Sequence, residues 1–169
     1  MAAVAADWVV VPGGPDDLEA IARQCRRLVN RRALVAAGAA VVPLPGIDWL
    51  TDIAVLLRLL PEINAAFGLT AEQIERLSPE RRVAAFKAVS AGGAVLIGRV
   101  VTRDVVFAVL RVAGVRLTVQ QASKWVPLAG QAVSAALSYS ALKLVCEQHI
   151  RDCIAVAGQL VPPTPTAVL

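Results

Sequence analysis

Cysteine and histidine are the side chains with the greatest capacity for chemistry in this chain, and most of them fall in one short stretch. Cys146, His149 and Cys153 are spaced i, i+3 and i+7, which places them on one side of a helix. With Cys25 they have the ligand types of a Cys₃His zinc site. The tight Cys-x-x-Cys spacing of structural zinc sites is absent, however. We therefore interpret the thiols as small buried hydrophobic groups beside an imidazole, and assign no metal and no cofactor.

Two further patterns could carry chemistry, but each has a simpler explanation. The sequence from Gly93 to Arg99 partly matches the pattern of a phosphate-binding loop, but it lacks the lysine and the hydroxyl residue of that pattern. Close helix packing therefore explains its glycines better. Asp48 and Asp52 lie one helical turn apart and could pair as carboxylates, although capping by Asp48 and an ion pair by Asp52 are simpler. A single histidine without a nucleophile signature predicts no catalytic site, no small-molecule substrate and no enzyme.

The basic residues are unevenly distributed and suggest a binding surface. Five arginines fall within ten residues that contain no acid: Arg23, Arg26, Arg27, Arg31 and Arg32. Beside an apolar segment, such a cluster suits an anionic membrane surface, at about 1 kcal/mol per basic residue. A solvated helix face is the alternative explanation. Nucleic-acid binding is disfavoured, because aromatic residues are not interleaved with the arginines and no reader motif occurs.

The composition indicates helices in apolar surroundings. Apolar residues make up 57% of the 169 residues, while aromatic residues make up only 4%, so the excess is alanine, valine and leucine. Charged residues are 18% and the net charge is +4. Three cysteines do not form a disulfide framework, and the first residues lack the basic start of a secretory signal. We therefore expect an intracellular chain.

The elements that must position these side chains turn at two similar corners. Val42–Gly46 and Val126–Gly130 share the pattern Val-Pro-Leu-x-Gly, and each interrupts a long apolar run. The predicted corner residues are Pro43, Pro45, Gly46, Asp48, Pro127 and Gly130. Trp49 and Trp125 lie beside the corners, where they could anchor at a membrane interface or fill the core.

Local signals predict the helices between these corners. A helix should begin at Asp16, a second should end with Gly68 as its C′ residue, and Thr70–Gln73 is a capping box that opens a short third helix. The β-branched stretch 95–110 could be a strand by propensity, but its arginines and threonine recur at helical spacing. We predict an all-α, compact bundle of five to seven helices built on two bent hairpins, with a domain over residues 16–160, an arm over 1–15 and a proline-rich tail over 161–169.

The corner residues also carry a resemblance. Val42–Asp48, the apolar helix up to Phe67-Gly68-Leu69, and the second corner with its Ala/Ser-rich helix resemble a bacterial domain of unknown function. That domain occurs C-terminal to Era-like GTPase domains and in YcjF-type inner-membrane proteins. The resemblance implies a helical, membrane-associated module, often paired with a GTPase, and it carries over no catalytic residue.

These observations lead to one functional expectation and two alternatives. We expect a non-enzymatic, membrane-associated module on the cytoplasmic face of the inner membrane, with anionic lipid and a protein partner, a small GTPase or a second copy. The first alternative is a soluble interaction or scaffold bundle with self-buried or oligomer-buried apolar faces. The weaker alternative is a membrane-permeabilising domain.

Overall fold

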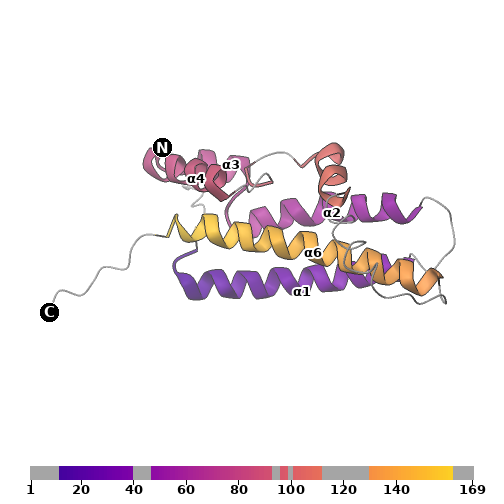
Figure 1. Ribbon diagram of the computed structural model, residues 1–169. Coiled ribbons are helices and arrows are strands. Elements are labelled where there is room, and N and C mark those ends of the chain that lie inside the picture. Colours follow the sequence, from indigo (N-terminus) through magenta and orange to yellow (C-terminus); the bar gives the residue numbers. More distant parts are fainter. Residues whose placement is uncertain (1–11, 40–46, 93–95, 99–100, 112–129, 162–169) are drawn as a thin grey trace, which may run out of the picture.

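Three long helices form the centre of the molecule. The computed structural model describes residues 12–39, 47–92, 96–98, 101–111 and 130–161. Its long helices are α1 (Pro15–Ala39), α2 (Ile47–Ala66) and α6 (Gly130–Gly158). In Figure 1, α2 and α6 run together, antiparallel to α1. Each of the three packs against the other two.

The buried face of α1 follows the apolar periodicity of its sequence. Leu18, Ala22, Cys25, Val29 and Ala33 recur every three or four residues and are at most 6% exposed. They pack against buried residues of α2 and α6, among them Leu56, Leu60, Ile63, Leu142, Ile150 and Cys153. Exposed residues, most of them polar or charged, occupy the opposite side of α1, so the buried face orients this helix about its own axis.

The end of α2 turns the chain sharply onto a smaller layer. Gly68 has φ +72°, its N–H donates to the carbonyl of Ala65, and the N–H of Leu69 donates to the carbonyl of Asn64. This pair of bonds is a Schellman motif, with glycine in the left-handed position as predicted. Pro61 lies inside α2, and the helix continues past it to Ala66.

Two short helices follow and cover one end of the bundle. The predicted capping box opens α3 (Ala71–Glu75), because Thr70 Oγ1 accepts from the N–H of Gln73 and the Gln73 side chain accepts from the N–H of Thr70. After it, α4 (Pro79–Gly92) packs against α6 on the side of the bundle away from α1 (Figure 1).

The β-branched stretch is helical over only part of its length. Residues 96–98 form a turn, with Gly98 at φ +67°, and residues 103–111 are helical, burying Val106 and Leu110. The N–H of Gly98 donates to the carbonyl of Leu69, so this turn docks on the corner after α2. The expectation of helix over strand is therefore met at 103–111, while the glycine interrupts the helix before it.

The fold class predicted from the sequence is confirmed. Within the described residues, the chain has five helices with defined bounds, a further helical stretch at 103–111, and no strand. Most of the predicted arm and tail, and both corner sequences except Gly130, lie outside the described residues. Gly130 begins α6, and Asp48 lies in the first turn of α2, one residue after its start.

Candidate interaction surface and buried polar cluster

Two arginines of the predicted cluster hold α1 between its neighbours. Arg26 forms a bidentate ion pair with Glu147 of α6, with Nε and Nη2 2.8–3.2 Å from the carboxylate oxygens. Arg32 binds Glu62 of α2 through Nη2, at 2.8 and 2.9 Å from the two oxygens. These side chains leave α1 on opposite flanks, so the helix is fixed in rotation as well as in position.

The ion pair between Arg26 and Glu147 shifts the pKa values of both partners. The hydrogen bond from Arg26 is the main cause that lowers the pKa of Glu147, and the same contact raises the pKa of Arg26. Both side chains remain partly exposed, at 40% and 28%, so solvent screens the pair. The pair therefore fixes geometry more than it adds stability.

A double-mutant cycle tests this pair. Combining Arg26→Ala with Glu147→Ala should give a coupling free energy of about 1 kcal/mol in chemical denaturation, because the contact is bidentate and partly buried. The matched control is Arg23 with Glu19, an exposed i, i+4 pair at 3.5 Å within α1. Its coupling should be about 0.4 kcal/mol. Equal couplings for the two pairs would contradict the role of Arg26 as a residue that holds α1 against α6.

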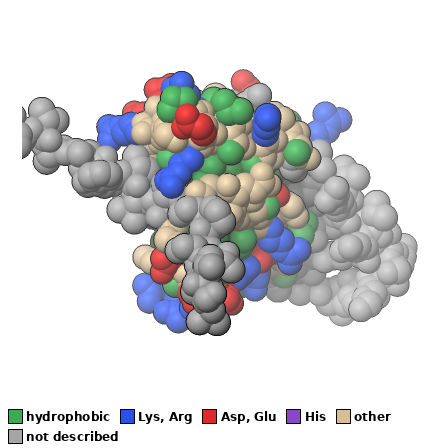
Figure 2. Space-filling view, turned by 90° about the vertical axis from the view of Figure 1, so that its left-hand side faces the viewer, with side chains coloured by type: hydrophobic (Ala, Val, Ile, Leu, Met, Phe, Trp, Pro, Cys, Tyr) green, Lys and Arg blue, Asp and Glu red, His purple; other side chains and the backbone are tan. Residues whose placement is uncertain are grey.

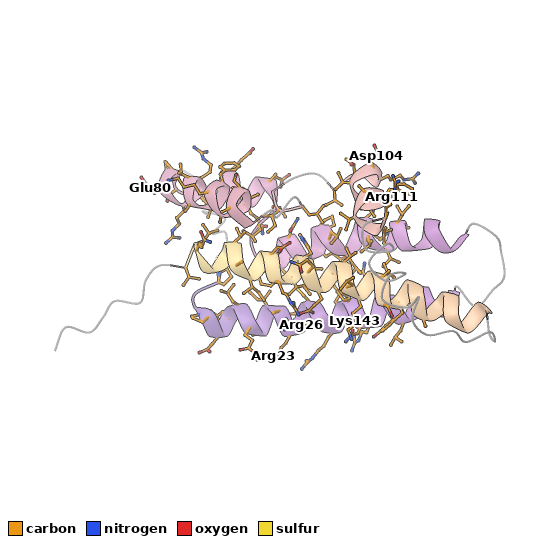
Figure 3. The ribbon with its side chains drawn as sticks, in the orientation of Figure 1. Arg23, Arg26, Glu80, Asp104, Arg111 and Lys143 are labelled. Atoms are coloured by element: carbon orange, nitrogen blue, oxygen red, sulfur yellow. The ribbon has the colours of Figure 1, made fainter. Side chains whose placement is uncertain are left out.

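The remaining arginines lie on the outer face of α1, which we define as Asp16, Asp17, Ala20, Arg23, Gln24, Arg27, Arg31, Leu34 and Val35. All nine are exposed and recur at helical spacing opposite the buried face. In Figure 3, Arg23 points away from α6, whereas Arg26 lies between the two helices. Within the described chain, no ion pair involves Arg27 or Arg31. The predicted cluster of five is thus divided in two. Arg26 and Arg32 form a clamp, by which we mean their ion pairs with Glu147 and Glu62, and the other three lie on the exposed face.

The outer face ends in two large apolar side chains. Leu34 is 62% exposed and Val35 is 74% exposed, one turn beyond Arg31. Exposed single hydrophobic residues are common, but two adjacent ones in line with unpaired arginines give a face that is basic and apolar at once. Such a face suits the boundary between lipid headgroups and acyl chains.

Other exposed apolar side chains are dispersed over the molecule. Val83 and Phe86 are 52% and 57% exposed on α4, and Phe107 is 50% exposed in the 103–111 helix. Figure 2 views the molecule from the end where α4 lies and shows hydrophobic side chains interspersed with basic and acidic ones. The side chain of Trp49 and the whole of Trp125 lie outside the described part, so neither tryptophan can be placed on a surface.

A buried polar cluster lies inside the bundle, centred on Asn64 of α2. Its amide nitrogen donates to the carbonyl of Leu96 at 2.9 Å, and its Oδ1 lies 2.9 Å from Nε2 of His149 on α6. Because the amide nitrogen is committed to Leu96, Oδ1 is the acceptor and Nε2 of His149 carries the proton. Both residues are at most 3% exposed. Asn64 thus joins α2, α6 and the 96–98 turn.

The chemistry around His149 is that of a structural group. Burial lowers the pKa of His149 to about 4, and a backbone hydrogen bond with Leu60 opposes this only in part. Cys153 Sγ lies 3.7 Å from His149 Nε2 and 3.6 Å from Asn64 Oδ1, but burial raises the pKa of this thiol. The nitrogen that faces this thiol is the one that donates to Asn64, and the thiol is fully buried. Nε2 of His149 carries a proton, so it has no lone pair with which to take a proton from the Cys153 thiol.

The remaining thiols are also kept protonated. Burial raises the pKa of Cys146 to about 12 and raises that of Cys25. All three cysteines are free and buried. In the part of the chain that the structure describes, no three His, Cys, Asp or Glu side chains are grouped so that they could hold a metal ion.

Asn64 is the residue of this cluster that the sequence analysis missed. The signal was present, because Asn64 is in helical phase with Leu56, Leu60 and Phe67, all of which are buried. A polar side chain on an apolar face needs a buried partner. Within the described residues, every buried side-chain nitrogen and oxygen has one.

Among the described residues, one segment, Ile53–Glu75, is long and apolar enough to cross a membrane by length and composition. It is not one straight helix, because α2 ends at Ala66 and the chain turns at Gly68 before α3 begins. Within it, Leu56, Leu60 and Ile63 face the bundle core. In the described arrangement the segment is a core helix followed by a corner.

Comparison of the chain with protein-family models, with curated proteins and with solved structures finds no significant match.

Proposed function

We propose that this chain is a non-enzymatic module that binds the surface of anionic membranes through the outer face of α1. The observation that carries the proposal is the continuous line from Arg23, Arg27 and Arg31 to the exposed Leu34 and Val35. Basic residues near an anionic surface contribute about 1 kcal/mol each, and apolar side chains add burial in the headgroup region.

The clamp supports this surface by fixing which side of α1 faces outward. Arg26 and Arg32 are bound to Glu147 and Glu62, so α1 can meet a membrane only with the side opposite its buried face. Binding would be peripheral, with the bundle core intact. A bound module would hold a partner at the cytoplasmic face, and the resemblance noted above makes a small GTPase the first partner to test.

Vesicle flotation with the whole chain tests the proposal. Arg27→Ala combined with Arg31→Ala should reduce the partition onto phosphatidylcholine–phosphatidylglycerol vesicles about 30-fold at low salt, which corresponds to about 2 kcal/mol. Pure phosphatidylcholine vesicles should bind the unsubstituted chain much more weakly. Raising the salt concentration should weaken binding to the anionic vesicles.

The matched control removes the same charge from another face. Arg81 and Arg82 are exposed on α4, which lies on the far side of the bundle from α1 (Figure 1). Arg81→Ala combined with Arg82→Ala should leave the partition within about twofold of the unsubstituted chain, if the outer face of α1 is the contact. Equal losses in the two double variants, or no binding of the folded chain at low salt, would refute the proposal.

A soluble scaffold is the second candidate function, because α4 exposes Val83 and Phe86 at i, i+3 on one side. That arrangement suits a helix of a partner or of a second copy. This reading predicts a chain that stays off vesicles and whose oligomeric state in light scattering changes in Val83→Ser, Phe86→Ser. A monomer that floats with anionic vesicles would exclude it.

A further inference from the structure

The outer face of α1 has an order along the helix that implies a direction of docking. Asp16 and Asp17 occupy its first turn, Arg23, Arg27 and Arg31 its middle, and Leu34 with Val35 its far end. The face therefore changes from acidic to basic to apolar in one direction. We propose that α1 meets an anionic bilayer at a tilt, with the Leu34–Val35 end inserted and the Asp16–Asp17 end held away. This inference rests on the proposed function above.

Electrostatics alone favours the tilt over a flat orientation. Asp17 and Val35 are eighteen residues apart, about 27 Å along the helix axis. This length exceeds the Debye length of about 8 Å at physiological ionic strength. A flat helix would bring Asp16 and Asp17 against like charge, whereas a tilted helix leaves them screened and keeps the arginines at the headgroups.

The apolar end determines which end of the helix is inserted. Leu34 and Val35 are largely exposed, so transfer of their side chains out of water is still available as a driving force. Arg31 lies one turn before them, within reach of the lipid phosphates when these two side chains enter the acyl boundary. Ala20, which is exposed on the same face near the acidic end, has no such apolar group to insert.

The buried thiols make the tilt directly measurable. Cys25, Cys146 and Cys153 are at most 3% exposed, and burial raises the pKa of each. Thiol reagents should therefore spare them in the folded chain, and a cysteine introduced on the outer face should take the label alone. The unsubstituted chain, which should remain unlabelled, is the control for this step.

The experiment compares a fluorophore at the two ends of the outer face. Ala20→Cys and Val35→Cys are labelled separately with an environment-sensitive probe and bound to phosphatidylcholine–phosphatidylglycerol vesicles, some carrying a quencher on the acyl chains. The tilt predicts a blue shift and at least several-fold stronger quenching at position 35 than at position 20. Leu34→Cys is a second probe of the inserted end and should behave like Val35→Cys.

The outcomes separate the two proposals. Equal quenching at both ends, or stronger quenching at position 20, would overturn the tilt while leaving membrane binding in place. Failure of every labelled chain to float with anionic vesicles would overturn both. A further measurement uses the double variant Asp16→Asn, Asp17→Asn. If the helix is tilted, its affinity for anionic vesicles should change by less than about twofold. If the helix lies flat, the variant should bind clearly more tightly.

Discussion

Replacing His149 by alanine is expected to lower the free energy of unfolding by about 3 kcal/mol. The substitution removes a fully enclosed ring from α6 and takes away the imidazole that donates to Oδ1 of Asn64 at 2.9 Å. The amide oxygen keeps only the weak thiol donor of Cys153, at 3.6 Å. Loss of packing and an undersatisfied buried acceptor both destabilise the folded state. Urea denaturation followed by circular dichroism measures the effect.

The control for this prediction is the residue next to it. Gln148 is exposed on α6 and its amide donates to Asp152 on the same helix, so Gln148→Ala should change stability by no more than about 0.5 kcal/mol. Equal costs at positions 148 and 149 would show that helix propensity dominates rather than the buried contact. That result would contradict the role assigned to the cluster.

A paired substitution separates the hydrogen bond from the packing. Asn64→Leu alone leaves the Leu96 carbonyl and the His149 ring without their partner, so it should destabilise strongly. Asn64→Leu combined with His149→Leu replaces both hydrogen-bonding side chains by apolar ones. The double variant should therefore be destabilised by less than the sum of the two single variants.

Local sequence rules account for much of the observed fold. The Schellman turn at Gly68 and the capping box Thr70–Gln73 each depend on residues within a few positions of one another. The buried face of α1 likewise follows from its apolar period alone. Such features depend on residues that are close together in the chain, which is why sequence reasoning reaches them.

The contacts that determine the candidate surface are not local. Arg26 and Glu147 are 121 residues apart, and Asn64 and His149 are 85 residues apart. The sequence grouped the five arginines by proximity, but the helical period and the neighbouring acids divide them between the clamp and the outer face. A contact between distant residues also decides the structure at 95–110. There the turn at Gly98 docks on Leu69 and interrupts a stretch whose local pattern favours continuous helix.

Acid should destabilise the chain over the pH range in which His149 is protonated in the unfolded state but not in the folded state. Burial lowers its pKa from 6.5 to about 4 in the folded state, so below pH 6.5 the unfolded chain takes up a proton that the folded chain does not. The stability present at neutral pH is therefore lost progressively from about pH 6.5 to about pH 4, by about 3 kcal/mol in total. Denaturation midpoints measured across this range should fall steadily.

Two carboxylates act at lower pH and must be distinguished from the imidazole. The pKa of Glu147 is lowered from 4.5, so its contribution is lost only as pH falls from that value through the folded pKa. Burial raises the pKa of Asp152 above 3.8, so the folded state binds that proton first and stability is gained as pH falls. Glu147 therefore leaves the slope at pH 6 unchanged, and Asp152 can only oppose the loss of stability caused by His149.

The slope near pH 6 therefore isolates His149. His149→Leu should abolish the change in unfolding free energy between pH 6.5 and 5, even though its stability at neutral pH differs from that of the unsubstituted chain. Because His149 is the only histidine, its ring proton signals can be followed by NMR without assignment and should stay in the neutral form at pH 5. A midpoint near 6.5 in the folded chain, or an unchanged slope in His149→Leu, would show that the imidazole is accessible to water and that the buried junction of α2, α6 and the 96–98 turn does not form as described.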